Sequence, residues 1–368
     1  MLTVVLPTRN RSAHCASLLR YLRKNGFAYP IVVLDASDAT HAEAVRAACA
    51  GVAEYRHFGP EFRMVDKLVA AVGTVETPYI VLMPDDDPVM PHAVEAALAF
   101  LQHHPDYVVA HGYFLGFGMD GVDFEIHSVI GFTSSIDSDD PLRRHAALFE
   151  RYQSFYWGVF RTDVFATAVT AAQAMNVVLF RELTVMSTSI LQGKVARLPI
   201  VYALRGTATS HAIPYDSHPL LWVLRNAESF FRHYLIYRNA LVRFIEDRGI
   251  AVPPGTQLEQ LLDMSHASWL AREADMSKIN LTTHLLLDRM ELDENLLPFA
   301  IPRWTGGRAL DPDDVRHLSI DGRRLYVWRR DVIQAEPAHE IAISQSEMAS
   351  VERQLDAYRL SKADQIQV

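Results

Sequence analysis

Three consecutive aspartates carry the clearest chemical signal in this sequence. Asp85, Asp86 and Asp87 stand between two prolines, directly after the apolar run Tyr79–Met83, which we expect to be a buried strand. Like charges this close repel one another unless a cation shares them. Carboxylate oxygens are hard ligands that suit Mg²⁺ or Mn²⁺. We therefore expect a divalent metal site here; the alternative is a solvated turn whose last aspartate caps the next helix.

Two further polar clusters follow expected strands. Pro7–Arg11 comes directly after the β-branched run Thr3–Leu6, and Asp35–Asp38 comes after Ile31–Leu34. In open α/β sheets, ligands bind beyond the carboxyl ends of the strands. A parallel sheet would bring both clusters and the aspartate trio to one rim, so we expect a binding site there.

The sequence lacks the usual glycine-rich phosphate-binding motifs. No Gly-x-Gly-x-x-Gly follows the first strand, and no Gly-x-x-x-x-Gly-Lys-Ser/Thr occurs anywhere, which disfavours a dinucleotide cofactor and a P-loop. Arg63 and Lys67 lie four residues apart on one helix face, from which either could lean over a diphosphate. The alternative is that both are solvated surface charges.

The elements that would position these residues follow an alternating pattern. Short β-branched runs alternate with amphipathic stretches, which predicts successive βαβ units and an α/β fold with a mainly parallel, mixed sheet. The expected strands are 3–6, 31–34, 52–57, 79–83, 107–114 and 195–204. The expected helices of this part are 12–25, 40–50, 61–72, 92–103, 146–152, 162–174 and 179–191, with an aspartate-rich loop region at 120–140.

The second half of the chain has a different character. Residues 219–248 predict a long amphipathic helix, residues 258–290 further helices, and residues 345–360 an exposed helix. Asp321-Gly322 between two alternating runs predicts a β-hairpin over 317–328. We expect two domains, an α/β domain over residues 1–212 and a mostly helical C-terminal extension over 213–368.

Composition limits the classes of protein that fit. Of 368 residues, 49% are apolar and 21% charged, and 35 Lys plus Arg against 44 Asp plus Glu give a net charge of −9. This acidic balance argues against a general nucleic-acid binder, which needs a basic face. Only Cys15 and Cys49 occur, so no disulfide framework or thiolate zinc site is indicated. With no apolar run long enough to span a bilayer, we expect a cytoplasmic protein.

Taken together, the three clusters resemble the family 2 glycosyltransferases of the GT-A fold, over about residues 1–210. The opening Val-Val-Leu-Pro-Thr-Arg-Asn-Arg-Ser is similar to that family's first strand and nucleotide loop, and Val-Val-Leu-Asp-Ala-Ser-Asp-Ala-Thr to its second strand with a nucleobase-binding aspartate. The aspartate trio stands where the family carries its DxD metal motif. The resemblance implies a GT-A domain that uses Mg²⁺ or Mn²⁺ and a nucleoside diphosphate sugar.

The resemblance also assigns roles to individual residues. The implied nucleotide site comprises Pro7, Thr8, Arg9, Asp35, Lys67, Asp85 and Asp86, with Asp35 on the base. The implied metal ligands are Asp87 and Asp85, with His211 as a third ligand in some GT-A enzymes. Asp35 has a helix-capping turn as its alternative role, and His211 a structural or surface role.

Family resemblance likewise points to an acceptor site. Inversion needs a carboxylate base near the acceptor hydroxyl, and Glu182 is the candidate, although Arg181-Glu182 replaces the family's usual Glu-Asp pair. A surface glutamate is the alternative, and the reserve carboxylates are Asp137, Asp139, Asp140 and Asp163. Tyr156 and Trp157 fall in the region similar to the acceptor floor, where aromatic rings stack on sugars. Core packing is their alternative role.

The expected function is therefore metal-dependent transfer of a sugar, with inversion, from a nucleotide diphosphate sugar donor to a glycan or glycolipid acceptor, in polysaccharide or glycoconjugate biosynthesis. A sugar nucleotidyltransferase and a non-catalytic GT-A-like scaffold are the rivals. The nucleotidyltransferase should show a glycine-rich basic loop after the first strand, which Pro7–Arg11 does not provide. The mixed arginine and aromatic face of residues 219–248 permits a peripheral contact with the inner face of the membrane. The sequence leaves the oligomeric state open.

Overall fold

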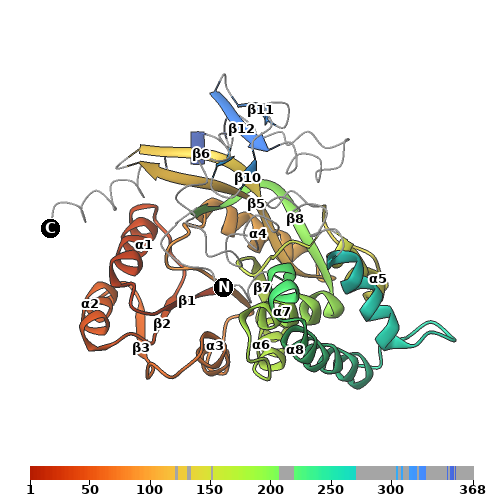
Figure 1. Ribbon diagram of the computed structural model, residues 1–368. Helices are drawn as coiled ribbons and strands as arrows, with labels where there is room; N and C mark the ends of the chain where they lie inside the picture. The colour runs from red at the N-terminus through yellow and green to blue at the C-terminus, as the bar shows by residue number, and fades with distance from the viewer. Residues whose placement is uncertain are drawn as a thin grey trace.

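A computed structural model describes residues 1–120, 123–130, 134–150, 152–206 and 219–270, together with 304–305, 308–309, 315–320, 323–328, 346, 349–351 and 353. Its main feature is an eight-stranded sheet in the order β3-β2-β1-β4-β7-β5-β6, with β8 paired to β5 (Figure 1). The strands are β1 (Leu2–Thr8), β2 (Ile31–Asp35), β3 (Glu54–His57), β4 (Tyr79–Leu82), β5 (Tyr107–Asp120), β6 (Asp123–Ile130), β7 (Val159–Arg161) and β8 (Lys194–Gly206).

Helices alternate with the strands along the first part of the chain. They are α1 (Ser12–Lys24), α2 (Ala39–Cys49), α3 (Met64–Val72), α4 (Pro91–His103), α5 (Pro141–Glu150), α6 (Thr162–Ala172), α7 (Val178–Gln192) and α8 (Pro219–Asp247). Strands β3, β2, β1 and β4 run parallel, whereas β7 is antiparallel to both β4 and β5. The predicted α/β fold with a mixed, mainly parallel sheet is confirmed.

Strands β6 and β7 correct the sequence-based assignment. Residues 120–140 were expected to be loops, but β5 extends to Asp120 and pairs with β6. The alternating Phe124 and Ile126 are typical of a strand, and the surrounding acidic residues obscured that pattern. Strand β7 has only three residues, too few for any periodicity to be visible, yet it lies in the middle of the sheet.

The sheet separates two hydrophobic cores. Along β1, the side chains of Val4 and Leu6 enter one core and Val5 enters the other, as the two-residue period of a strand requires. Helices α1, α2 and α4 contribute to the first core, and α3, α5, α6, α7 and α8 to the second. Strands buried on both faces explain why β1, β2 and β4 are apolar runs without alternation.

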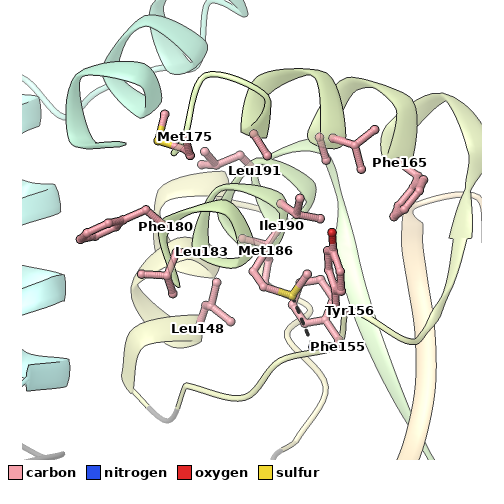
Figure 2. Packing of buried hydrophobic residues seen from close by; sticks show 14 of the residues in the cluster. Leu148, Phe155, Tyr156, Phe165, Met175, Phe180, Leu183, Met186, Ile190 and Leu191 are labelled. Atoms are coloured by element: carbon pink, nitrogen blue, oxygen red, sulfur yellow. Dashed lines mark hydrogen bonds between the residues drawn. The ribbon is translucent and has the colours of Figure 1, made fainter. Parts of the chain in front are cut away.

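Helix α7 lies at the centre of the second core. Leu183, Met186 and Ile190 are fully buried, and Figure 2 shows them packed among side chains of neighbouring elements. The backbone N–H of Phe155 donates a hydrogen bond to Sδ of Met186 at 3.3 Å. Buried Arg144 donates hydrogen bonds to carbonyl oxygens in the last turn of α7, at 2.8 Å to Ile190 and 3.2 Å to Leu191. These contacts fix the position of α7.

Helix α8 packs against α7 through aromatic rings. Phe180 of α7 has its ring centroid 5.7 Å from Trp222, 5.6 Å from Phe230 and 5.4 Å from Tyr237. The helix is kinked at Asn226, which has φ −154° and ψ 76°. Residues 258–270 form a further helix, and Leu258 and Leu262 are buried in the same core.

Part of the predicted C-terminal extension lies within the described residues. Strands β11 (Val315–Ile320) and β12 (Arg323–Trp328) pair antiparallel, which confirms the hairpin expected there, and β9 (Trp304–Thr305) pairs with β10 (Arg308–Ala309). The helical predictions for 271–290 and for most of 345–360 fall outside the described residues, and the domain boundary at 212 stays a prediction. Within the described part of the chain, every helix is too short or too polar to cross a bilayer.

Candidate functional site

The loops after β1 and β4 meet at one edge of the sheet. Both strands run parallel, with Val5 opposite Leu82, so their carboxyl ends emerge side by side. A cavity of about 600 Å³ opens at this edge. Most of the predicted site residues line it, namely Pro7, Thr8, Arg9, Lys67, Asp85, Asp86, Asp87, Tyr156, Trp157 and Glu182.

The chain itself supplies a cation for part of the aspartate trio. Arg11 donates from Nη1 to Oδ1 of Asp85 at 2.8 Å and from Nη2 to Oδ2 of Asp86 at 2.5 Å. Thr8 donates from its hydroxyl to Oδ2 of Asp85 at 2.8 Å. Burial raises the pKa of Asp85 to about 6, and Arg11 and Thr8 oppose that shift. The sequence analysis placed Arg11 in the loop after β1 but did not predict this pairing. The available signal was that a basic cluster and an acidic cluster follow two strands expected to end at the same edge of the sheet.

Asp87 differs from Asp85 in its exposure. Asp85 is only 5% exposed, and both of its carboxylate oxygens accept hydrogen bonds, whereas Asp87 is partly exposed at the cavity. Among the described residues, no group of three or more His, Cys, Asp or Glu side chains could hold a metal ion. Mg²⁺ usually binds through one or two carboxylates and completes its shell with water and substrate phosphate. A cation shared with a phosphate ligand would need only one or two of these carboxylates, and the metal site at Asp87 and Asp85 stays a prediction.

Lys67 and Arg63 are both engaged with the protein. Lys67 is buried, and its ammonium donates to the carbonyl oxygens of Thr8 at 2.9 Å and Leu34 at 3.0 Å. Burial lowers the pKa of Lys67 to about 8. Arg63 forms a two-pronged ion pair with Asp66, at 2.7 and 2.8 Å. Lys67, which lines the cavity, thus ties together the ends of β1 and β2, and its predicted contact with a diphosphate stays a prediction.

Asp35 lies inside the protein, next to the cavity wall and not on it. Its side chain is 0% exposed, with Oδ1 accepting from the backbone N–H of Ser37 and Oδ2 from the hydroxyl of Tyr55, both at 2.9 Å. Asn10, at φ 52°, ties the neighbouring β1 loop to Ser37 through a 2.7 Å hydrogen bond from its backbone N–H. Asp35 thereby orders the rim of the site, and its contact with a nucleobase stays a prediction.

The cavity lining also contains a carboxylate and two aromatic rings. Glu182, in the second turn of α7, accepts a hydrogen bond on Oε1 from the hydroxyl of Tyr152 at 2.7 Å. Tyr156 and Trp157 lie edge to face with their ring centroids 5.4 Å apart, and both line the cavity. Of the described residues lining the cavity, Glu182 is the one carboxylate outside the aspartate trio.

The reserve carboxylates lie elsewhere. Asp139 is 96% exposed and pairs with Lys194 at 2.8 Å, and Asp140 caps the start of α5 by accepting from the backbone N–H of Leu142. Asp137 and Asp163 are exposed, and none of the four is among the cavity-lining residues of the described chain. His211, the predicted third metal ligand, falls outside the described residues.

Other cavity residues carried no sequence signal. Arg181 is partly buried on the cavity wall, and burial lowers the pKa of its guanidinium. Neither Arg181 nor exposed Arg9 makes a side-chain hydrogen bond or ion pair with the described residues. Phe62, Met64 and Val178 add apolar surface to the cavity rim, with Val178 57% exposed. The cavity thus combines acidic, cationic and apolar walls.

Comparisons with known proteins leave the family open. No family model matches the chain, and no curated protein matches it significantly. Among solved structures, S. aureus TarS 1–349 matches with a TM-score of 0.47 and 15% identity, over 100% of this chain and 91% of that one. TarS itself matches with a TM-score of 0.48 and 16% identity, over 98% of this chain and 54% of that one. TarS 1–349 in complex with UDP-GlcNAc gives 0.48 and 15%, over 100% and 91%. TM-scores below 0.5 at such identities do not establish a common function.

Proposed function

We propose that this chain is a glycosyltransferase that moves a sugar from a nucleoside diphosphate sugar to a hydroxyl of a glycan or glycolipid acceptor, with inversion. One observation carries the proposal. A single cavity of about 600 Å³, at the carboxyl ends of parallel strands, is lined by the aspartate trio and also by Glu182 and two aromatic rings. This arrangement provides separate places for a diphosphate and for an attacking hydroxyl.

The donor would bind at the aspartate wall. A diphosphate carries negative charge that repels Asp85–Asp87 unless cations intervene. Arg9 offers a guanidinium that makes no ion pair with the described residues, and Asp87 offers a carboxylate for Mg²⁺ or Mn²⁺. A divalent cation bound there would neutralise the charge that develops on the departing nucleoside diphosphate. Arg11, Thr8 and Lys67 would keep this wall rigid before the donor arrives, because each is hydrogen-bonded to the protein.

The acceptor would bind beside Glu182, Tyr156 and Trp157. Its hydroxyl oxygen forms a bond to the anomeric carbon while the bond from that carbon to the phosphate oxygen breaks, and the electron pair leaves with the nucleoside diphosphate. The hydroxyl proton passes to the carboxylate of Glu182, which acts as a general base. Attack from the face opposite the leaving group inverts the configuration. Tyr156 and Trp157 would hold the acceptor, because sugar C–H faces pack against aromatic rings.

Nucleotide release tests the proposal. The full chain is incubated with UDP-, GDP- and dTDP-linked hexoses with Mg²⁺ or Mn²⁺, and the nucleoside diphosphate released is measured with and without glycan acceptors. Glu182→Gln should lower the rate by about 10²- to 10⁴-fold while the donor still raises the melting temperature. Asp163→Asn is the matched control, since Asp163 is exposed and lies away from the cavity.

Three results would contradict the proposal or part of it. Absence of nucleotide release with every donor would refute the transferase activity. Release of pyrophosphate in place of a nucleoside diphosphate would indicate nucleotidyl transfer. A wild-type rate for Glu182→Gln would remove the assigned base.

A further inference from the structure

Glu182 has a hydrogen-bond partner that sequence reasoning did not find. Tyr152 follows α5, thirty residues earlier in the chain, and its hydroxyl lies 2.7 Å from Oε1 of Glu182. A carboxylate can only accept, so the phenol is the donor. Burial and the neighbouring Glu182 charge hold the pKa of the Tyr152 phenol well above its usual value. Tyr152 therefore keeps its proton and remains a donor over the whole working pH range of an enzyme.

The ring of Tyr152 is held in place from behind. It stacks on Phe149 with centroids 5.8 Å apart and contacts Trp269 at 5.4 Å. Phe149 in turn packs on His266, with centroids 4.2 Å apart. Two aromatic neighbours leave the Tyr152 ring little freedom to rotate away, so its hydroxyl gives Glu182 a fixed partner.

The two oxygens of the Glu182 carboxylate have different surroundings. Oε1 accepts from Tyr152, whereas Oε2 accepts no hydrogen bond from the described residues. Glu182 lines the cavity and Tyr152 does not. One oxygen of this cavity-lining side chain is thus anchored by Tyr152, and the other makes no hydrogen bond with the described residues.

We propose that Tyr152 is a positioning residue for Glu182, a role that rests on the proposed function. By holding Oε1, Tyr152 fixes the rotation of the carboxylate and leaves Oε2 to receive the acceptor proton. Tyr152 exchanges no proton in this step. A hydrogen bond donated to the charged form of a carboxyl group stabilises that form, and Tyr152 supplies such a bond to Glu182.

Other titratable and charged groups lie around the pair. Tyr156 and Arg181 interact electrostatically with each other, and Tyr156 also with Glu182. Arg63, which directly precedes α3, and Asp66 of α3 interact electrostatically with Arg181, and Tyr237 of α8 interacts with Tyr152. The test therefore needs a substitution that removes only the Tyr152 hydroxyl.

Tyr152→Phe is that substitution, because it keeps the ring between Phe149 and Trp269. Tyr234→Phe is the matched control. Tyr234 also donates its phenol to a carboxylate, Asp263, at 2.5 Å, and it contacts His266 in the same aromatic cluster, but it does not line the cavity. Both variants lose one phenol–carboxylate hydrogen bond, and only one of them loses it at Glu182.

The assay is the pH dependence of nucleotide release from the panel of UDP-, GDP- and dTDP-linked hexoses. Tyr152→Phe should lower kcat by about three- to tenfold and move the acid limb of the pH–rate profile upward, with KM for the nucleotide sugar unchanged. Tyr234→Phe should leave both the profile and kcat as in the wild type. In a Glu182→Gln background, Tyr152→Phe should cause no further loss, because the base is already absent.

Failures of the two proposals are distinguishable. If Glu182→Gln is inactive but Tyr152→Phe matches Tyr234→Phe in rate and pH profile, Tyr152 has only a structural role and the inference is wrong. An additional loss in the Glu182→Gln background would also contradict it. If Glu182→Gln has the wild-type rate, or no nucleotide sugar is turned over, the proposed function itself fails and the role of Tyr152 fails with it.

Discussion

Replacing Lys67 with methionine tests whether its ammonium is buried and charged in the folded protein. Lys67 is 3% exposed, and among the described residues its ammonium donates only to carbonyl oxygens, those of Thr8 and Leu34. Methionine has a similar length and keeps the apolar stem packed, but it removes the charge and both hydrogen bonds. The effect on stability should depend strongly on pH.

The magnitude follows from the pKa of Lys67. Burial lowers it from 10.5 to about 8, against the opposing attraction of Asp35 and Asp85. Between these two values the unfolded chain binds more protons at this residue than the folded chain does, so the wild type gains stability as pH rises. At about 1.4 kcal/mol per unit, the gain between pH 8 and pH 9.5 is about 2 kcal/mol. Lys67→Met lacks this titration.

Urea unfolding, followed by tryptophan fluorescence between about pH 7 and pH 9.5, measures the effect. The difference in unfolding free energy between wild type and Lys67→Met should grow by about 2 kcal/mol in favour of the wild type across this range. Subtraction removes the titrations that both proteins share. Lys24→Met, on the exposed last turn of α1, is the control and should give a constant difference. A constant difference for Lys67→Met as well would refute the buried-ammonium account.

Three other substitutions test separate parts of the structure. Asp87→Ala should abolish metal-dependent nucleotide release and leave the urea midpoint unchanged, and normal turnover would remove Asp87 from the site. Gly158→Ala should destabilise by about 1–3 kcal/mol, because a Cβ there would lie 2.9 Å from Cγ1 of Val109, and an unchanged melting temperature would contradict this close packing. Arg144→Met should lower the unfolding free energy by about 2–4 kcal/mol, because buried carbonyl groups, including those of Ile190 and Leu191, lose their donor. A loss below about 0.5 kcal/mol would show that water replaces that donor.

The parallel half of the sheet was predictable because its strands are buried on both faces. Continuous apolar runs such as Tyr79–Met83 can bury all of their side chains only where helices cover both faces of the sheet, as in a layered α/β fold. The polar residues that follow parallel strands of this kind then gather at one edge of the sheet. The antiparallel part was not predictable in the same way. Strand β7 is defined by pairing with β4 and β5, which are distant in sequence, and local patterns do not record such pairings.

The sequence predicted which residues belong to the site better than it predicted which partners they contact. The aspartate trio does line a cavity, but the sequence could not show that Arg11 neutralises Asp85 and Asp86. Lys67 has the charge expected of a phosphate ligand, yet its position on α3 directs it to main-chain oxygens. Periodicity identifies the buried face of a helix without indicating which polar group that face will meet.

The sequence could not predict side-chain hydrogen bonds between residues that are distant along the chain. Tyr152 and Glu182 belong to segments that α6 and β7 separate in the chain, and no motif links them. Asp35 occupies the expected position at the end of β2, but Tyr55 of β3 draws its carboxylate inward. Both contacts depend on how neighbouring elements pack.

The most direct test of the central claim is a crystal structure of the full chain soaked with Mn²⁺ and UDP or GDP. The account predicts density for a diphosphate in the cavity at the ends of β1 and β4, with the metal bound to Asp87 and the nucleotide on the same side as Arg9. Glu182 should line the same cavity as the bound nucleotide. Nucleotide density elsewhere on the protein, or a cavity that stays filled with solvent at saturating nucleotide, would contradict the account.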